Sequence, residues 1–439
     1  MTEDSVRIGL LGLGTVGAGT VALLQRNAAG IAQRTGKHLR VVAAAVRDLQ
    51  RARPIALDGI RLSDRPDELV TDPGVDIVVE LMGGEEPARE LVLAALSHGK
   101  PVVTANKALI ALHGNEIFAA ANRHNLTVAF EAAVAGGIPI IKALREAMAG
   151  NRINRVAGII NGTGNFILTE MEQNDRDFSD VLVEAQRLGY AEADPTFDIE
   201  GIDAAHKLTI LAAIAFGTPL NFDAVYTEGI SRISRGDVTY AGELGYRIKH
   251  LGIASMEDGR LSVRVHPTLI PNDTPLANVS GVTNAVLVES DPAGHTLYYG
   301  PGAGAGPTAS AVVADLIDTV RMLGCDAGSR VPPLGLHFEG EVTPDLLPMD
   351  DVRTAFYLRM QAIDRPGVLG EVLRIFGDAG ISIEAIRQRE PDEEASSVDV
   401  IMVTHRVREG AMRGALEAVA ALDSITAPVT RIRLEQLGD

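Results

Sequence analysis

The chain has 439 residues, of which 46% are hydrophobic and 22% charged, and its formal net charge is −18. This length allows two or three domains with a buried core, whereas the acidity argues against nucleic acid or an anionic membrane as a partner. The single cysteine, Cys325, excludes internal disulfides and cysteine-based metal clusters. The N-terminus MTEDSVRIGLLG is acidic and no apolar stretch reaches the length of a membrane span, so we expect a cytoplasmic protein without a signal peptide.

The first 140 residues alternate short apolar runs with segments of helical character. VRIGLL, VVAAAV, IVVELM, PVVTAN and LTVAFEAAV predict buried strands, and VGAGTVALLQRN, ARELVLAALSHG and KALIALHGNEIFAAANRHN predict helices between them. Strands that alternate with helices predict an α/β fold with a doubly wound parallel sheet of the Rossmann type. We expect this domain to span residues 1–140 and to be completed by an apolar helix at about 305–325.

The pattern loosens in residues 141–304, where a long helical region precedes the alternating runs LSVRVHPTLI, AVLVES and TLYYG. These runs predict an α+β domain with an open antiparallel sheet. Residues 326–353 contain the proline- and acid-rich GEVTPDLLPMDDV and are expected to form a linker. From 354 to 439 the predicted elements follow the order βαββαβ, which is typical of a ferredoxin-like domain.

A glycine motif of the form GxGxxG directly follows the first predicted strand. Gly12 permits a tight turn, Gly14 lets the backbone approach a pyrophosphate, and Gly17 allows close packing of helix and strand. The helix that follows presents free N–H groups to the anion. The motif therefore predicts a dinucleotide site, with an ordinary turn in a glycine-rich chain as the alternative.

Two residues after the second predicted strand bear on the choice of cofactor. An acidic residue there binds the 2′-hydroxyl of NAD, whereas an arginine accepts the 2′-phosphate of NADP. VVAAAV runs into Arg47 and then Asp48, so we expect NADP, and NAD remains open. A solvated surface arginine is the alternative interpretation.

Lys107 closes PVVTANK, where a parallel strand passes into a helix. Ligands of open α/β sheets bind outside the carboxyl ends of the strands, so this lysine is expected to face a phosphate or a substrate carbonyl. Contact with solvent alone is the alternative.

The segment GYAEADPTFDIEGIDAAHKL, residues 189–208, holds five carboxylates and one lysine. Asp203 and Lys207 are one turn apart on a helix that continues as LTILAAIAF, so much of that helix should be buried. Burial lowers the pKa of a lysine and a nearby carboxylate opposes the fall, which would let Lys207 exchange a proton with a substrate hydroxyl. A salt bridge on the helix surface is the alternative.

Cys325 stands in RMLGCDAG, at the end of an apolar helix, and is expected to be structural. An aldehyde dehydrogenase that forms a thiohemiacetal needs a positioned cysteine nucleophile. A direct hydride transfer between alcohol and aldehyde is therefore favoured.

The segment AQRLGYAEADPTFDIEGIDAAHK, residues 185–207, resembles the signature of the homoserine dehydrogenases. GLGTVG, TANKALI, FEAAVAGGIP, NGTGNFIL and GPGAGAGPTA are similar to further segments of that family in the same order, over about residues 5–325. The tail resembles an ACT domain through IDRPGVLGEVLRIFGDAGISI, which gives the layout of the monofunctional bacterial members.

The resemblance implies NAD(P)H-dependent reduction of L-aspartate 4-semialdehyde to L-homoserine, a step shared by threonine, methionine and isoleucine synthesis. It implies that Lys207 is the general acid/base, that Asp203 and Glu192 hold the substrate, and that Lys107 lies near nicotinamide and substrate. Further cofactor contacts are implied for Leu13, Thr15, Val16, Gly189 and Gly304. Residues 141–304 then bind substrate and form the dimer contact of a homodimer or homotetramer.

The resemblance also implies a monovalent cation site, sodium in the family. The corresponding residues of FEAAVAGGIP are Glu131, Val134, Gly136 and Ile138. Such a site uses mainly backbone carbonyls, and hard cations prefer oxygen ligands. The residues themselves predict only a strand and a turn.

Asp364 and Gly367 of IDRPGVLGEV lie at a strand-to-helix turn where free N–H groups can take the carboxylate of an amino-acid effector. The resemblance implies that paired tails form this site at their interface, and threonine is the favoured effector. A module used only for dimerisation is the alternative.

Two other functions stay open. The chain could be a catalytically silent amino-acid sensor, against which the presence of Lys207, Asp203 and Glu192 argues. It could also be another Rossmann oxidoreductase, which the choice of amino-acid substrate in an assay would distinguish.

Overall fold

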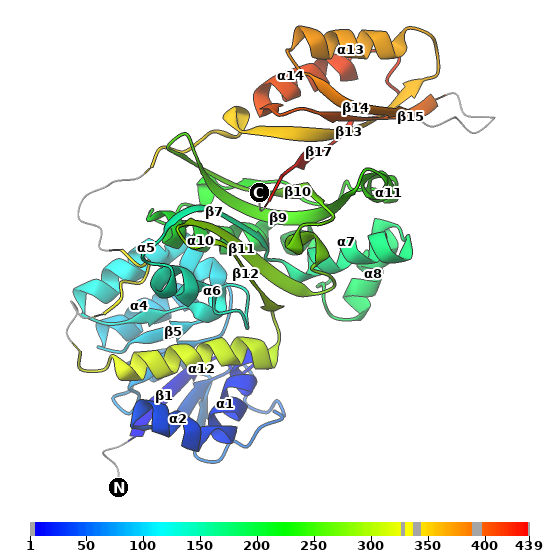
Figure 1. The fold of residues 1–439 in the computed structure, drawn as a ribbon. Helices are drawn as coiled ribbons and strands as arrows, with labels where there is room; N and C mark the ends of the chain where they lie inside the picture. The colour runs from blue at the N-terminus through cyan, green and yellow to red at the C-terminus, as the bar shows by residue number, and fades with distance from the viewer. Residues whose placement is uncertain (1–4, 326–329, 337–343, 389–396, 438–439) are drawn as a thin grey trace. The chain divides into compact units, whose positions relative to one another are not determined.

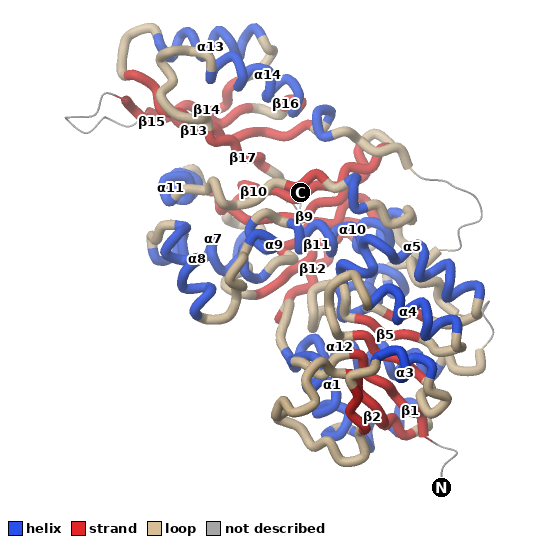
Figure 2. The backbone as a smooth tube through the Cα atoms, turned by 180° about the vertical axis from the view of Figure 1, so that it is seen from behind, coloured by secondary structure: helices blue, strands red, loops and turns tan. Residues whose placement is uncertain are grey.

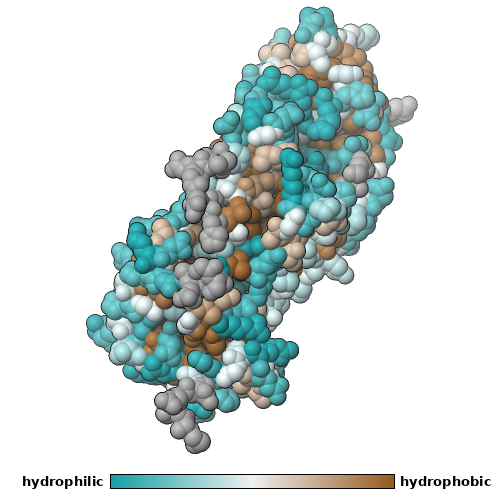
Figure 3. All heavy atoms as spheres, turned by 60° about the vertical axis from the view of Figure 1, so that its left-hand side comes forward, coloured by the Kyte–Doolittle hydropathy of each residue, from teal (hydrophilic) through white to brown (hydrophobic). Residues whose placement is uncertain are grey.

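A computed structural model describes residues 5–325, 330–336, 344–388 and 397–437 (Figure 1). The chain divides into two compact units, each made of three stretches of sequence. The first unit contains residues 1–156, 206–223 and 283–343, and the second contains residues 157–205, 224–282 and 344–439. None of the described helices combines the length and the apolar character needed to cross a membrane. On the face drawn in Figure 3, hydrophilic side chains predominate, with smaller hydrophobic areas between them.

The first unit is built on a six-stranded parallel sheet, which confirms the predicted doubly wound fold. In spatial order its strands are β3 (Arg61–Ser63), β2 (His38–Ala45), β1 (Ser5–Leu11), β4 (Ile77–Glu80), β5 (Val102–Thr104) and β6 (Val128–Ala129). All neighbouring strands pair in parallel. This 3-2-1-4-5-6 order is that of dinucleotide-binding sheets.

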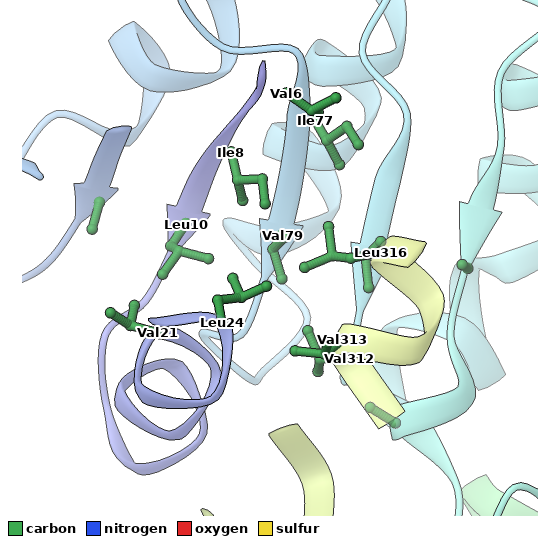
Figure 4. Close-up of a cluster of buried hydrophobic side chains, with 14 of the residues drawn as sticks. Val6, Ile8, Leu10, Val21, Leu24, Ile77, Val79, Val312, Val313 and Leu316 are labelled. Atoms are coloured by element: carbon green, nitrogen blue, oxygen red, sulfur yellow. The ribbon is translucent and has the colours of Figure 1, made fainter. Parts of the chain in front are cut away.

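Helices cover both faces of this sheet. They are α1 (Thr15–Arg26), α2 (Ala28–Thr35), α3 (Pro66–Thr71), α4 (Ala88–Ser97), α5 (Lys107–Arg123), the short α6 (Ile140–Lys142) and α12 (Ala305–Arg321). Figures 1 and 2 show α12 beside α1. Val312 and Leu316 of α12 join Ile8 and Leu10 of β1 in the core, as Figure 4 shows.

The two faces of β1 meet different helices because side chains alternate along a strand. Ile8 and Leu10 belong to the cluster with α1 and α12. Gly9 faces the other way, where a Cβ atom would lie 2.7 Å from the side chain of Leu69 in α3. The sheet is therefore buried on both faces, as its continuous apolar strands predict.

The predicted strand LTVAFEAAV is much shorter than expected. Only Val128–Ala129 is extended, and a 3-10 helix, η1 (Glu131–Ala133), follows. The carboxylate of Glu131 accepts backbone N–H groups of Ile141 and Lys142, both at 2.9 Å, and this turns the chain out of the sheet.

The second unit is built on a mixed sheet. Its strands, in spatial order, are β7 (Arg152–Ile159, of which the last three residues belong here), β9 (Tyr246–Glu257), β10 (Arg260–Pro271), β17 (Thr430–Leu434), β13 (Arg353–Ile363), β15 (Ser397–Thr404) and β14 (Ile383–Gln388). Short strands β8 (Tyr226–Thr227) and β16 (Val407–Arg408) pair with β10 and β13. Its helices include α7 (Gly162–Asn174), α8 (Phe178–Arg187), α9 (Thr196–Ile199), α11 (Arg235–Glu243), α13 (Val368–Asp378) and α14 (Glu409–Ala420).

The tail has the predicted βαββαβ order. Its strands lie in the order β17-β13-β15-β14, which is the 4-1-3-2 arrangement of a ferredoxin-like sheet. Figure 1 shows α13 and α14 side by side over these strands, and the two helices are in contact. Phe356, Leu358 and Phe376 are among the buried side chains beneath them.

The compact units differ from the predicted domain boundaries at 140/141 and 304/305. The hairpin of β11 (Thr283–Asp291) and β12 (Gly294–Pro301) belongs to the first unit, where the Gly137 N–H donates to the Pro301 carbonyl at 3.0 Å. Helix α10 (Ile202–Phe216) begins in the second unit and ends in the first. Each compact unit is therefore assembled from separate stretches of the sequence.

The tail belongs to the same compact unit as residues 157–205 and 224–282. Tyr357, Val403 and Ile432, on the other face of its sheet, pack in one core with Ile167 and Leu269. β17 also pairs in parallel with β10 and antiparallel with β13. The tail and the middle of the chain therefore share a sheet and a core.

Arg433 of β17 lies fully buried at this junction. Its guanidinium donates to both carboxylate oxygens of Glu409, at 2.9 and 2.7 Å, and to Glu228 at 2.9 Å. It also donates to the Tyr226 hydroxyl at 3.1 Å and lies 5.0 Å from the centre of that ring. Burial, the largest single effect, would raise the pKa of Glu228, but the charge and hydrogen bond of Arg433, the Tyr226 hydroxyl and the charge of Arg431 together lower it.

We predict that Arg433→Met destabilises the protein by roughly 3–5 kcal/mol, because it leaves buried carboxylates without their arginine. Thermal unfolding measures this, and Arg433→Met/Glu409→Leu should recover part of the loss since a buried ion pair can be replaced by apolar groups. Arg374→Met is the matched control, because Arg374 and its partner Asp378 are 69% and 72% exposed, and it should cost less than about 1 kcal/mol.

The pH dependence follows from the lowered pKa of Glu228. Its contribution to the free energy of unfolding is present above about pH 4.3, the usual pKa of glutamate, and is lost as the pH falls through the lower pKa of the folded state.

Equal destabilisation by Arg433→Met and Arg374→Met would contradict the importance of the buried network.

Candidate active site

The glycine turn after β1 has the geometry that a pyrophosphate requires. Gly12 has φ +97°, and a Cβ atom there would lie 2.8 Å from the carbonyl oxygen of Leu81. A Cβ on Gly17 would lie 2.5 Å from the Gly12 oxygen, whereas at Gly14, which precedes α1, nothing lies within 4 Å. Gly12 and Gly17 therefore pack tightly, and Gly14 leaves open the space in front of the helix.

The other residues of the turn differ in exposure. Leu13 is buried, Val16 is partly buried and Thr15 is exposed. Gly304, with φ +110°, precedes α12. A Cβ on Gly19 of α1 would lie 2.6 Å from the Ala305 oxygen, so the structure brings the starts of α1 and α12 together.

Arg47 follows β2 and is exposed. The neighbouring carboxylate of Asp48 accepts the backbone N–H groups of Gln50 at 2.9 Å and Arg51 at 3.2 Å. Asp48 therefore supports its own turn, while Arg47 is exposed at the same edge of the sheet. At this position Arg47 is thus better placed to bind a 2′-phosphate than Asp48 is to bind a ribose hydroxyl.

Lys107 is the first residue of α5, as predicted, and is partly buried. Asn106 caps this helix through its side-chain oxygen, which accepts the Leu109 N–H at 3.1 Å. Because β1 and β5 are parallel members of one sheet, Lys107 leaves the sheet at the same edge as the glycine turn.

Asp203 and Lys207 lie one turn apart on α10. Asp203 is only 3% exposed, and most of the helix is buried as predicted. Lys207 itself is only partly buried, less than its sequence context suggests, because its side of the helix is incompletely covered.

Asn161 orients the carboxylates of this region and is absent from the residues predicted above. Its amide nitrogen donates to Asp198 and to Asp203, both at 2.8 Å, while its oxygen accepts the Gly164 N–H at 2.7 Å at the start of α7. Asn161 is 5% exposed. An asparagine between a buried strand and a glycine-rich helix start, as in NGTGNFIL, is the signal that could have identified it.

Glu192 lies exposed in the loop between α8 and α9. Gln186 fixes this loop by donating to the backbone carbonyls of Glu192 at 3.1 Å and Ala193 at 3.3 Å. Thr163 donates to the Tyr190 carbonyl at 2.7 Å, and so ties the loop to the first turn of α7. Gly189, in the same loop, has φ +75° and open space at its Cβ position.

The turn predicted to hold a cation contains buried carbonyl oxygens. Val134 and Gly136 are buried, and within the described part of the chain their carbonyls accept no hydrogen bond. The Ile138 carbonyl accepts the Ile140 N–H at 2.8 Å, and the carboxylate of Glu131 is shared with two backbone N–H groups. The carbonyls of Val134 and Gly136 thus fit a hard cation best, since buried carbonyls normally have a partner.

Asp315 of α12 lies next to this turn and accepts the Glu131 backbone N–H at 2.7 Å. Burial, with the charge of Glu131, raises the pKa of Asp315 to about 8. Among the described residues, no group of three or more histidine, cysteine or acidic side chains is placed to bind a metal ion. A cation here would depend on the backbone.

Asp364 and Gly367 are exposed at the turn between β13 and α13. Gly367 has φ +97° and precedes α13. A small cavity of about 50 Å³ adjoins the turn and is lined by Asp364, Arg365, Val368 and Val398, among others. The turn thus has the predicted form.

Two larger cavities of the first unit, of about 580 and 640 Å³, contain none of the predicted catalytic residues. The second is lined by Ser5, Asp76 and Pro101, at the amino ends of β1, β4 and β5. Ligands of open parallel sheets bind at the opposite, carboxyl edge. We therefore place the cofactor by the glycine turn.

Cys325 lies beyond the last turn of α12, and its thiol donates to the Arg321 carbonyl at 3.6 Å. Helix α12 has 17 residues, so its two ends are about 25 Å apart. Gly304 is at the first end and Cys325 at the other, which keeps the thiol away from the glycine turns.

Three sequence profiles match the chain. They are "Homoserine dehydrogenase, NAD binding domain" at residues 12–131, "Homoserine dehydrogenase" at 139–317 and "ACT domain" at 356–423. The homoserine dehydrogenase of Pseudomonas aeruginosa is 55% identical over 437 residues, covering 98% of this chain and 99% of the relative.

Solved structures agree with these matches. The crystal structure of a homoserine dehydrogenase from Thiobacillus denitrificans has a TM-score of 0.94 and 58% identity, covering 99% of each chain. A hyperthermophilic archaeal homoserine dehydrogenase in complex with NADPH has a TM-score of 0.60 and 29% identity, covering 72% of this chain and 97% of the relative. From its profile matches and its full-length relatives, the chain belongs to the homoserine dehydrogenase family of NAD(P)-dependent oxidoreductases.

Proposed function

We propose that the chain reduces L-aspartate 4-semialdehyde reversibly to L-homoserine, with Lys207 as the general acid/base. The observation that carries this proposal is the buried carboxylate of Asp203, oriented by Asn161 at 2.8 Å, one helical turn before Lys207. A zwitterionic substrate needs fixed charges, and an alcohol–aldehyde conversion needs a group that exchanges one proton. A catalytically silent sensor would need neither feature.

The proposed roles divide the chemistry among four side chains. NADPH, when bound, supplies the hydride. Lys207 donates a proton to the aldehyde oxygen during reduction and takes it back during oxidation. Asp203 and Glu192 hold the amino acid, with Glu192 suited to its ammonium group because its carboxylate is exposed on an anchored loop. Lys107, at the carboxyl edge of the sheet, faces the nicotinamide and the substrate carbonyl.

We predict that Lys207→Ala lowers kcat by about 10² to 10⁴, the usual cost of losing a general acid or base. The dissociation constant of NADPH, followed by its fluorescence, should stay nearly unchanged. Lys37→Ala serves as the control, because Lys37 is an exposed lysine of the first unit. A near-normal kcat in Lys207→Ala would remove the acid/base assignment.

NADP is the proposed cofactor, with NAD as the second candidate. Asp48 is engaged by its own turn, which leaves Arg47 to meet a 2′-phosphate. The archaeal relative in complex with NADPH supports the same choice. The glycine turn contributes Gly12, Leu13, Gly14, Thr15, Val16 and Gly17, and Gly189 and Gly304 are further proposed contacts.

Arg47→Ala should raise the KM for NADPH about ten- to a hundredfold, since a hydrogen bond to a charged group is worth roughly 1.5–3 kcal/mol. The KM for NADH should barely change. Steady-state kinetics with both cofactors measure the ratio, and Arg34→Ala, an exposed arginine of α2, is the control. An unchanged NADPH/NADH ratio would make Arg47 an ordinary surface residue.

Several further expectations stand as proposals. A sodium ion would bind at Glu131, Val134, Gly136 and Ile138. The buried carbonyls of Val134 and Gly136 support this, since no group in the described residues donates a hydrogen bond to them. The protein is proposed to be cytoplasmic and to form a homodimer or homotetramer. The domains are proposed at 1–140 with a helix at about 305–325, 141–304, and 354–439 after a linker at 326–353. The profile limits at 131 and 139 lie near the 140/141 boundary, and the limit at 356 lies near the 353/354 boundary.

The tail is proposed to bind an amino-acid effector, threonine above all, at the turn of Asp364 and Gly367. The ACT match supports an effector, and the exposed N-terminus of α13 can receive a carboxylate. The cavity at this turn is only about 50 Å³, so a second tail would have to complete the site.

Threonine should shift the apparent affinity for substrate several-fold, because coupling between two sites is typically about 1–3 kcal/mol. Removal of the tail would strip Tyr357, Val403 and Ile432 from a shared core, so a substitution is the better test. Asp364→Ala should weaken the response, and Asp378→Ala, at the exposed end of α13, should not. If threonine neither binds in calorimetry nor alters the rate, the tail is structural.

A further inference from the structure

Glu80 ends β4 as a carboxylate with no role in the proposed mechanism, yet it is completely buried. One oxygen accepts the backbone N–H groups of Met82 at 2.7 Å and Gly83 at 3.3 Å. The other accepts the hydroxyl of Thr104 at 2.6 Å. Burial raises the pKa of Glu80 and these donors oppose the rise, so the carboxylate depends on all of them.

Thr104 has a defined direction in this arrangement. Its oxygen accepts the Asn106 N–H at 3.0 Å, so its only proton is directed to Glu80. The hydroxyl is buried and bridges the end of β4 to the turn after β5. A valine of the same shape could fill the space, but it could not form either hydrogen bond.

Asn106 ties the same two loops a second time. Its amide nitrogen donates to the Gly84 carbonyl at 2.6 Å, and its oxygen caps α5 by accepting the Leu109 N–H at 3.1 Å. Lys107 is the next residue along the chain. The loop of residues 81–84 is therefore fixed to the helix start that presents Lys107.

The other side of this loop touches the glycine turn. The Leu81 N–H donates to the Leu11 carbonyl at 2.8 Å, and the Leu81 carbonyl faces Gly12 closely enough to exclude a Cβ atom. Gly83 and Gly84 have φ +73° and +78°, with open space where side chains would project. The loop thus lies between the proposed pyrophosphate site and Lys107 and presents bare backbone.

We propose that Glu80 and Thr104 are positioning residues, which hold loop 81–84 as a spacer that sets Lys107 at a fixed place relative to the glycine turn. The proposal rests on the proposed function, in which Lys107 faces nicotinamide and substrate. Misplacement of a reacting group by about 1 Å can cost about a hundredfold in rate, so such a spacer would act on kcat.

The test compares two substitutions of Thr104 that separate hydrogen bonding from packing. Thr104→Val keeps the volume and loses the hydroxyl, whereas Thr104→Ser keeps the hydroxyl and loses a methyl group. We expect Thr104→Val to lower kcat about 10- to 100-fold, with the dissociation constant of NADPH changed less than about threefold. Thr104→Ser should retain kcat within about threefold. Thr319→Val, at a buried threonine of α12 in the same unit, is the control and should match the wild type.

Glu80→Gln provides the second arm, because glutamine has a single acceptor oxygen and cannot accept both the Thr104 hydroxyl and the N–H groups of Met82 and Gly83. It should lower kcat as Thr104→Val does. The kcat of the double variant should be no lower than that of the slower single variant, since both substitutions disrupt the same hydrogen-bond network. If packing decides, Thr104→Ser will be impaired and Thr104→Val will not, and the proposal is overturned. Additive losses in the double variant would overturn it as well. If the wild type and Thr319→Val are active, the proposed function stands whatever the Thr104 and Glu80 variants show.

Discussion

All six strands of the first unit run in the same direction, and this constraint decides where its functional loops can lie. Parallel strands deliver their carboxyl ends to one edge, so the turns after β1, β2, β4 and β5 leave the sheet together. Gly12, Arg47, Gly83 and Lys107 all follow strands at that edge. The glycine turn is then kept narrow by its packing against Leu81, and the loop of residues 81–84 is fixed by buried hydrogen bonds.

The second unit depends on β17, which joins the strands of the tail to those of the middle of the chain in one sheet. β17 pairs with β10 on one side and with β13 on the other, and Arg433 fixes it through Glu409 and Glu228. The ACT domain therefore cannot be treated as an appendage. A change in its packing would be felt in the core that also contains α7, the helix capped by Asn161. An effector bound at the proposed site would therefore act on the same packed core as α7.

Sequence alone predicted those features that repeat along the chain or depend on neighbours in it. The doubly wound sheet, the βαββαβ tail, the glycine turn and the place of Lys107 at the start of α5 follow from periodicity and local turns. The role of Asn161 could not be predicted in this way, because its two carboxylate partners lie 37 and 42 residues further along the chain. Nor could the pairing of Glu80 with Thr104 or the shared core of the tail, since each requires tertiary contacts that no local pattern encodes. The partial exposure of Lys207 was missed for the same reason.

As an NAD(P)-dependent oxidoreductase of this family, the protein is proposed to transfer hydride directly from the nicotinamide to the aldehyde carbon of L-aspartate 4-semialdehyde. The most direct test lets the enzyme reduce L-aspartate 4-semialdehyde with NADPH that is deuterated at the transferable position of the nicotinamide. The product is then analysed by NMR and mass spectrometry. We expect homoserine that carries one deuterium on the carbon with the new hydroxyl group, and we expect it to form at the rate at which NADPH is consumed. Homoserine without deuterium at that carbon, or no homoserine at all while the enzyme binds NADPH, would contradict this proposal.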